Sequence, residues 1–373
     1  MNEPAAPGTR LEGLALVARE NGGFALEEIL TAPLTPTSIA IETTWSGVSF
    51  GTEFAVLSGK LDWGPFPLVT GYMGAGRVTH VGADVSGYRT GDRVYYRRNL
   101  ELVTRASGES LNCAAGVHAS VAVLDPRGDH GADHIPDNVP DDIASMFVLP
   151  AVGLTGVNQA RVGTGDTVVV IGSGQIGLSV VAASIARGAR VLAVDIRPEP
   201  LEAATGLGAH HVVDSTKADV EEEVHRIFGA DGVDFVFEAT GRKDSIDLGI
   251  RLCRQFGCFV WQGNYGKGPV SFDFLPAHGR RLRMVFPCDD GYRPSRRAVM
   301  TSLGQGLLKW GLTMTDRIEH ESAPAFYART LEQGLGGVLG ASIHWGGTVA
   351  PRHLGQTATL RRRIGPPPPS PSS

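Results

Sequence analysis

VVVIGSGQIGLSVVAASIARGARVLAVDI, residues 168–196, is the stretch of the chain that decides the fold. It begins with an apolar run that predicts a strand buried on both faces, continues through the glycine spacing GxGxxG, and then has the composition of a helix. In such a turn the first glycine permits the tight bend, the second lets a pyrophosphate approach the backbone, and the third lets the helix pack against the strand. The phosphates bind at the helix N-terminus, where unpaired N–H groups favour anions. We therefore expect a dinucleotide site formed by Gly172, Gly174, Gln175, Ile176 and Gly177.

Asp195 ends the second strand of this unit, 21 residues after Gly174. A carboxylate in this position accepts hydrogen bonds from the ribose hydroxyls of the adenosine and repels a 2′-phosphate, so Asp195 predicts NAD as the cofactor. Arg197 follows shortly afterwards and could soften this preference, which leaves NADP possible. Asp195 and Arg197 both belong to the expected cofactor-binding residues.

The character of the sequence changes near residue 141. Before it, short β-rich runs alternate with glycine-rich turns, which predicts an all-β, barrel-like domain. After it, apolar strands alternate with helical segments, among them SIDLGIRLCRQFG at 245–257, which predicts an α/β domain with a parallel, doubly wound sheet. The expected division is a β-rich domain at 1–155, a dinucleotide-binding domain at 156–292, a return to the first domain at 293–350 and a disordered, proline-rich tail at 351–373.

Composition limits the possible partners. The chain has 373 residues, and its 34 basic and 39 acidic residues give a net charge of −5, which argues against nucleic acid. No apolar run approaches the ~20 residues that cross a bilayer, and the N-terminal MNEPAAPGTR lacks the apolar core of a signal peptide. The four cysteines show neither a CxxC pair nor a disulfide spacing. We expect a cytoplasmic, reduced protein that acts on a small molecule and has no membrane or nucleic-acid partner.

Four further motifs carry a resemblance to a known family. They are VSFGTEFAVLSG at 48–59, PLVTGYMGAGRV at 67–78, VGADVSGYRTGDRV at 81–94 and LPAVGLTG at 149–156. Together with the glycine turn, they resemble the medium-chain dehydrogenase/reductase superfamily from roughly Leu14 to Trp345, and most closely its bacteriochlorophyllide dehydrogenase-like branch. The resemblance implies a GroES-like catalytic domain, a Rossmann cofactor domain and a site between them.

The resemblance also raises the question of a metal. Zinc-dependent members of the superfamily carry ligands at positions that correspond here to Phe50, Tyr72, Met73 and Ala151. A catalytic zinc needs about three protein N, S or carboxylate ligands, and none of these side chains binds zinc well. The structural-zinc lobe of relatives needs four closely spaced cysteines, and the corresponding region has Cys113 alone. We therefore expect a zinc-independent member with no metal site.

Without zinc, hydride transfer needs a hydrogen-bond donor aimed at the developing oxyanion, or an acid that protonates carbon. Tyr72 stands in a former ligand position and offers a phenol, while Thr52 corresponds to the hydroxyl of the zinc enzymes' proton relay. Glu53 either pairs with a nearby arginine, Arg77 or Arg97, or serves as an acid or base; we favour the pairing. The expected catalytic residues are Tyr72, Thr52 and Glu53.

By the same resemblance, Thr155 lies beside the nicotinamide ring and Asn264 lies near the backbone atoms that hold its carboxamide. His118, by contrast, corresponds to a residue that is often structural, and we leave it out of the site. Relatives commonly pair the edge strands of two Rossmann sheets, which predicts a homodimer through the strand around RLRMVFP at 281–287.

Two reactions and one non-catalytic role fit these motifs. Interconversion of a polar alcohol and ketone with NAD(H) is favoured by the SGVSFGTE segment. Reduction of an activated C=C bond, as in zinc-less quinone or enoyl reductases, is favoured by the missing zinc ligands. A non-catalytic NAD-binding protein would bind the cofactor without turning over any alcohol, ketone or enone. We favour the alcohol reaction.

Overall fold

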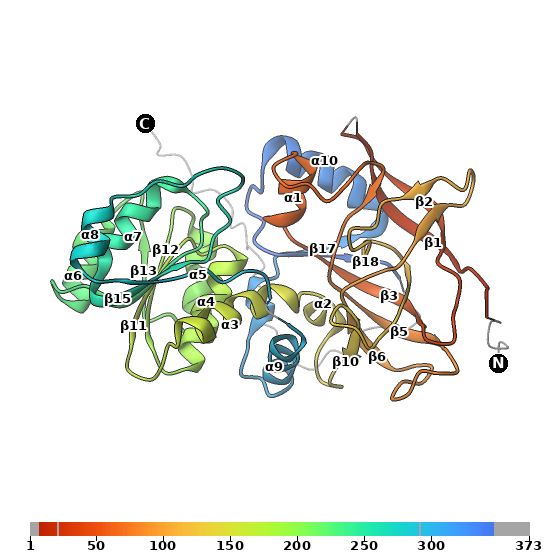
Figure 1. Ribbon diagram of the computed structural model, residues 1–373, viewed down its shortest axis with the longest axis horizontal. Helices are drawn as coiled ribbons and strands as arrows, with labels where there is room; N and C mark the ends of the chain where they lie inside the picture. The colour runs from red at the N-terminus through yellow and green to blue at the C-terminus, as the bar shows by residue number, and fades with distance from the viewer. Residues whose placement is uncertain (1–6, 21, 291, 347–373) are drawn as a thin grey trace, which may run out of the picture.

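The computed structural model describes residues 7–20, 22–290 and 292–346. It has two lobes side by side (Figure 1). One lobe, on the left of Figure 1, consists of a parallel sheet between helices, and the other, on the right, consists mostly of antiparallel strands. The segment with α2 (Asp141–Ala144) and α3 (Val148–Ala160) crosses between the lobes.

In the described chain, the sheet of the first lobe has six parallel strands in the order β13-β12-β11-β14-β15-β16, which confirms the predicted doubly wound sheet. The order reverses beside β11, and ligands of such sheets bind where this happens, at the carboxyl ends of the strands. The strands are β11 (Thr167–Ile171), β12 (Arg190–Asp195), β13 (His211–Asp214), β14 (Val233–Glu238), β15 (Cys253–Trp261) and β16 (Arg283–Val285).

The apolar run of β11 is continuous because both of its faces are covered. Val168 and Val170 belong to a core with α3 and α4, whereas Val169 and Ile171 pack into a second core with α6, α7 and α8. The helices are α4 (Gln175–Ala186), α5 (Pro198–Gly206), α6 (Val220–Phe228), the 3₁₀ turn η1 (Lys243–Ser245), α7 (Ile246–Leu252) and α8 (Phe274–Gly279).

The predicted helix at 245–257 was wrong in its second half. The helix α7 ends at Leu252, and β15 begins at Cys253. Val233 of β14 pairs with Cys253, and the register shifts before Phe235 pairs with Cys258. Pairing with the neighbouring strand β14 overrides the helical period of LCRQFG.

The second lobe has two sheets. Its first sheet consists of β4 (Leu68–Val69), β1 (Glu12–Ala18), β2 (Phe24–Thr31), β7 (Leu102–Thr104) and β8 (Ser110–Leu111). Its second sheet consists of β10 (Ala132–His134), β6 (Arg93–Tyr96), β5 (Gly74–Val81), β3 (Ile39–Val48), β18 (Ala341–His344) and β17 (Asp316–Glu319), with β9 (Val121–Leu124) also paired to β3. The long strand β3 leads directly to the short helix α1 (Thr52–Leu57).

The last strand of the described chain returns to the lobe that contains the first strands, where it pairs with β3. After β16 come α9 (Arg293–Gly304), the 3₁₀ turns η2 (Trp310–Thr313) and η3 (His320–Ser322), and α10 (Ala323–Gln333). The strand β18 then runs antiparallel to β3, with Ile343 opposite Ser46. This pairing places the last strand against the segment that leads into α1. The expected tail at 351–373 lies outside the described residues.

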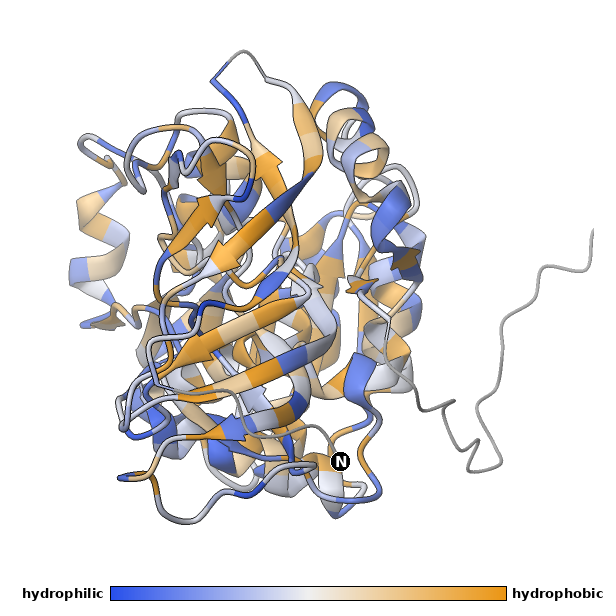
Figure 2. Ribbon diagram, turned by 90° about the vertical axis from the view of Figure 1, so that its right-hand side faces the viewer, coloured by the Kyte–Doolittle hydropathy of each residue, from blue (hydrophilic) through white to orange (hydrophobic). Residues whose placement is uncertain are grey.

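Many strands are coloured as hydrophobic along much of their length, whereas the helices alternate between hydrophilic and hydrophobic stretches (Figure 2). The four cysteines are free. Among the described residues, none of the helices combines the length and the apolar character that a membrane span needs.

Candidate active site

The turn between β11 and α4 has the geometry that a dinucleotide needs. Gly172 adopts a φ of +88°, a left-handed backbone conformation that residues with a side chain rarely adopt. A Cβ on Gly177 would lie 1.8 Å from the carbonyl oxygen of Gly172, so glycine is what lets α4 pack this close. A Cβ on Gly174 would meet nothing within 4 Å, which leaves open space at the start of α4. Such a space suits a phosphate group, because the first N–H groups of a helix have no partner within it.

Asp195 and Arg197 lie at the end of β12, beside the same turn. The Asp195 carboxylate accepts hydrogen bonds from the backbone N–H groups of Ser173, at 2.7 Å, and of Arg197, at 3.0 Å. The Arg197 guanidinium makes two long contacts, at 3.4 Å each, to the carbonyl oxygens of Gly336 and Val338 in the other lobe. Asp195 thus faces the turn that would hold a cofactor, whereas the Arg197 side chain is directed toward a loop.

Two glutamines at this edge of the sheet carry buried polar atoms without a hydrogen-bond partner in the described chain. Gln175 donates from Nε2 to the carbonyl oxygens of Thr313 and Leu339, at 3.1 Å each, but its Oε1 has no partner. Gln262 follows β15, and both polar atoms of its amide lack a partner. It faces α3, since a Cβ on Gly156 would lie 2.0 Å from its Oε1. Buried polar groups are costly when unpaired, so these atoms suit a ligand with polar groups, as a dinucleotide has.

Thr155 and Asn264 lie near the same edge but use their polar groups within the protein. The Thr155 hydroxyl is buried and donates to the carbonyl oxygen of Asp290, at 3.0 Å. Asn264 is exposed, and its Oδ1 accepts a hydrogen bond from the N–H of Gly266, at 2.8 Å. The contacts of these two residues with a nicotinamide stay predictions.

Tyr72 lies just before β5, and the segment at the start of α1 holds its hydroxyl. The O–H donates to Oγ of Ser49 at 2.5 Å, and the hydroxyl of Thr52 lies 3.4 Å away. Trp63 packs edge-on against the ring, and Cζ of Arg97 lies 5.7 Å from the ring centre. Burial raises the pKa of Tyr72 above its ordinary value of 10.0, so the phenol keeps its proton at neutral pH. The structure therefore brings Tyr72 and Thr52 together.

Glu53 also lies in α1, but its carboxylate points away from solvent and has no exposed surface. Its Oε1 accepts a hydrogen bond from the backbone N–H of Ser49, at 2.8 Å. Its Oε2 lies 2.9 Å from Nε2 of His118 and accepts a hydrogen bond from the hydroxyl of Tyr327, at 2.8 Å. Glu53 thus holds Ser49, the residue that accepts the hydrogen bond from Tyr72.

The expectation that Glu53 pairs with Arg77 or Arg97 was wrong. Arg77 donates to the carbonyl oxygen of Gly91, at 3.3 Å, and Arg97 pairs with Asp290, at 3.1 Å. The reason is that Glu53 turns into the lobe, toward partners that arrive from far along the chain. A buried carboxylate can be satisfied by neutral donors as well as by a cation.

The sequence analysis left His118 out of the site as a structural residue, and it did not single out Ser49 or Tyr327, although all three surround Glu53. The N–H of Trp345 donates to Oγ of Ser46, at 2.7 Å, and Ser46 in turn lies 2.7 Å from Nδ1 of His118. If the Ser46 hydroxyl donates to Nδ1, then Nε2–H is the ring donor to Glu53, and every group is satisfied. Burial would raise the pKa of Glu53, but the His118 ring, with hydrogen bonds from the Ser49 N–H and the Tyr327 hydroxyl, outweighs it and lowers the pKa. A polar ring at the start of the apolar run HASVAV was the available signal.

Three of the positions that correspond to zinc ligands carry apolar side chains, which pack against other apolar residues. Phe50 lies 5.8 Å from Phe54, measured between ring centres, and Met73 and Ala151 are fully buried among apolar residues. Across the described ranges, no three His, Cys, Asp or Glu side chains gather in a way that could hold a metal ion. These residues do not fit a zinc ion at this site.

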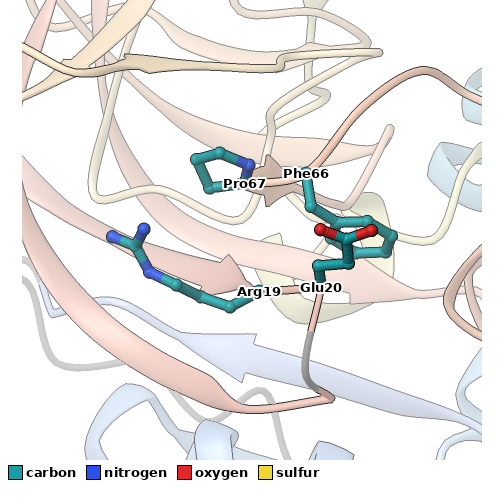
Figure 3. Close-up of a pocket in the computed structure, with 4 residues that line it drawn as sticks. All are labelled: Arg19, Glu20, Phe66 and Pro67. Carbon is teal, nitrogen blue, oxygen red and sulfur yellow. The ribbon is translucent and has the colours of Figure 1, made fainter.

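A surface pocket of about 490 Å³ lies elsewhere in the β-rich lobe (Figure 3). It is lined by Arg19, Glu20, Phe66 and Pro67. None of the residues predicted for the site lines it, so we do not assign the reaction to it.

Known families match both lobes. A model described as "Alcohol dehydrogenase GroES-like domain" matches residues 35–131, and one described as "Zinc-binding dehydrogenase" matches residues 176–297. These matches confirm the expected combination of a GroES-like domain with a Rossmann domain.

Individual proteins agree with the family models. A probable D-xylulose reductase A of Arthroderma otae is 33% identical over 59% of this chain and 67% of its own length. An S-(hydroxymethyl)glutathione dehydrogenase of Escherichia coli is 30% identical over 65% of this chain and 74% of its own length. The structure of a putative zinc-binding dehydrogenase from Sinorhizobium meliloti bound to NADP superimposes with a TM-score of 0.78, at 21% identity, over 90% of this chain and 99% of its own.

The glycine turn, the parallel sheet, the GroES-like lobe and these relatives lead to one assignment. The chain belongs to the medium-chain dehydrogenase/reductase superfamily of NAD(P)-dependent dehydrogenases.

Proposed function

We propose that this chain is a zinc-independent oxidoreductase that transfers a hydride between NAD(H) and a polar alcohol or ketone. The observation that carries the proposal is the hydroxyl group of Tyr72, held by Ser49 and Thr52 where zinc-dependent relatives have a metal ligand. Relatives named as a probable D-xylulose reductase and an S-(hydroxymethyl)glutathione dehydrogenase support an alcohol or ketone as the substrate. Phe50, Met73 and Ala151 support the loss of zinc, because none of them offers a good ligand.

The cofactor, when bound, donates or accepts the hydride at its nicotinamide ring. The chain's own residues then handle the oxygen and the proton. In reduction, the Tyr72 hydroxyl donates a hydrogen bond to the carbonyl oxygen, where negative charge develops. In oxidation, Tyr72 accepts the proton of the substrate hydroxyl and passes its own to Thr52, whose hydroxyl lies 3.4 Å away. Thr52 is partly exposed and can release a proton to solvent, while Ser49 keeps the Tyr72 hydroxyl in place.

In this proposal Glu53 is a positioning residue. Its carboxylate has no exposed surface, and its oxygens are occupied by Ser49, His118 and Tyr327. A group enclosed in this way does not touch a substrate. It holds the backbone of Ser49, and through Ser49 it fixes the direction of the Tyr72 hydroxyl.

Replacing Tyr72 by Phe tests the role of its hydroxyl. Loss of one well-aimed donor to an oxyanion typically lowers kcat by about 10²–10³, and phenylalanine keeps the packing of the ring. We expect that loss in turnover with an unchanged affinity for NADH, and a smaller loss for Thr52→Val. Tyr96→Phe is the matched control, because Tyr96 is also buried and bonds through its hydroxyl to Thr43, at 2.7 Å. Turnover of Tyr72→Phe equal to that of Tyr96→Phe would rule out the proposed role.

The metal question has its own test. Purified protein should hold far less than one zinc per chain in elemental analysis, and chelators should leave the oxidation of alcohols and reduction of ketones unchanged. The same assay, run with enones, separates the alcohol reaction from reduction of C=C bonds. One tightly held zinc per chain, lost together with activity, would contradict the proposal, and turnover of enones alone would support the second reaction.

Asp195 should give the protein a preference for NAD(H) over NADP(H). Its carboxylate faces the turn and would repel a 2′-phosphate, while the Arg197 guanidinium contacts the loop at 336–338. In fluorescence titrations we expect Asp195→Ala to narrow the gap between the two nucleotides, and Arg197→Ala to leave it nearly unchanged. Gly174→Ala should weaken binding of both, because its methyl group enters the open space beside α4. Tighter binding of NADPH by the unmodified protein would overturn the assignment.

We also propose a homodimer that pairs the β16 strands of two copies. In the described sheet β16 is an edge strand, and the unpaired backbone groups of an edge favour association. Phe286 follows β16 directly and is strongly exposed, with 67% of its surface accessible.

Light scattering at micromolar concentration should show a dimer. Phe286→Glu should convert it to a monomer, because a charge would be buried in the interface. Leu307→Glu changes a similarly exposed residue beyond α9 and should leave the dimer intact. A monomeric unmodified protein, or a dimer that survives Phe286→Glu, would contradict this assembly.

A further inference from the structure

Arg97 is the charged group that lies against Tyr72. It follows β6 directly, and its Cζ lies 5.7 Å from the centre of the Tyr72 ring. Its side chain keeps 16% of its surface exposed. A guanidinium has five N–H donors, and within the described ranges one of them has an acceptor, Oδ1 of Asp290 at 3.1 Å. Arg97 is therefore fixed next to the candidate donor, with hydrogen-bonding capacity to spare.

The carboxylate of Asp290 pairs with two guanidinium groups, those of Arg97 and Arg296. Asp290 has no exposed surface and also accepts hydrogen bonds from Nε and Nη2 of Arg296, the latter at 3.2 Å. Arg296 is almost fully buried, and its second partner, Asp129, is 55% exposed, so solvent screens that pair. Two guanidinium groups thus share one buried carboxylate. Of the two, Arg97 is the guanidinium that lies against Tyr72, and within the described ranges it keeps N–H groups without an acceptor.

A contact between the lobes explains only part of this arrangement. Asp290 follows β16 in the Rossmann lobe, and its carbonyl oxygen is already held by Thr155 of α3. Arg296 already gives the carboxylate a hydrogen bond to each oxygen. A further donor from the other lobe is not needed to satisfy Asp290, and it brings an additional positive charge to the side of Tyr72.

We propose that Arg97 binds an anionic group, a carboxylate or a phosphate, carried by the alcohol substrate. The inference rests on the proposed function and narrows its substrate to hydroxy acids or phosphorylated polyols. The reacting hydroxyl or carbonyl oxygen contacts Tyr72, and the anion contacts the free N–H groups of Arg97. The planar fork of a guanidinium matches both carboxylate and phosphate oxygens.

The test compares neutral and anionic alcohols on the intact, NAD-loaded enzyme. One pair is a sugar alcohol and its terminal phosphate ester, and the other is a hydroxy acid and its amide. We expect kcat/KM to favour the anionic member of at least one pair, and the pair that responds tells phosphate from carboxylate. Arg97→Gln should raise KM for that anion about 10- to 100-fold, as expected for lost hydrogen bonds to a charged group. Its effect on the neutral member should be small.

Two further variants test whether the effect of Arg97→Gln comes from a general loss of structure. Arg97→Lys keeps a charge that can pair with Asp290 and should restore part of the preference without the bidentate geometry. Arg98→Gln removes a neighbouring arginine that is exposed and should change nothing. The preference for the anion should also fall as ionic strength rises.

The outcomes separate this inference from the function on which it rests. Equal kcat/KM for neutral and anionic alcohols, unaffected by Arg97→Gln, would overturn the inference and leave the alcohol reaction standing. If no alcohol or ketone is turned over, the proposed function fails, and calorimetry of inorganic phosphate and of malonate with the NADH-loaded protein decides the inference. Binding that Arg97→Gln abolishes supports it, and absence of binding refutes it.

Discussion

A buried carboxylate, that of Glu53, is the constraint on which the candidate site depends. It joins α1 to Tyr327 of α10 and to His118. These two residues lie 274 and 65 positions from Glu53 along the chain. Each oxygen is occupied, as it must be, because an unsatisfied buried polar group costs about 1–3 kcal/mol and a charged one more. Once Glu53 is fixed, the backbone of Ser49 is fixed, and with it the direction of the Tyr72 hydroxyl.

In the function proposed above, a group of hydroxyls takes the place of the metal of zinc-dependent relatives. Zinc lowers the pKa of an alcohol or polarises a carbonyl by its charge. In the proposal, Tyr72 donates a hydrogen bond instead, and burial raises its pKa, so that the donor stays protonated. Arg97, next to the ring, supplies positive charge without a metal, and Asp290 ties that charge to the cofactor lobe. In this proposal the two lobes contribute to one site.

The features that the sequence predicted are those set by local rules. GxGxxG between a strand and a helix indicates a dinucleotide turn because each glycine answers a local steric demand, which the φ of Gly172 and the close approach of Gly177 bear out. The predicted end of the helix at 257 was wrong, because residues from Cys253 onward have a helical period but pair with β14. The predicted partners of Glu53 were also wrong because contacts between distant segments decide them. His118 and Tyr327 approach Glu53 only in the folded chain, and no spacing near Glu53 indicates them.

The central claim is that Tyr72 contacts the reacting oxygen in a site without metal. A crystal structure of the enzyme with NADH and a bound ketone, with anomalous data recorded at the zinc edge, tests it most directly. The account predicts the Tyr72 hydroxyl about 2.5–3.0 Å from the carbonyl oxygen and no anomalous peak at the site. A metal peak beside Tyr72, or a carbonyl oxygen bound by other groups while Tyr72 keeps its bond to Ser49, would contradict the account.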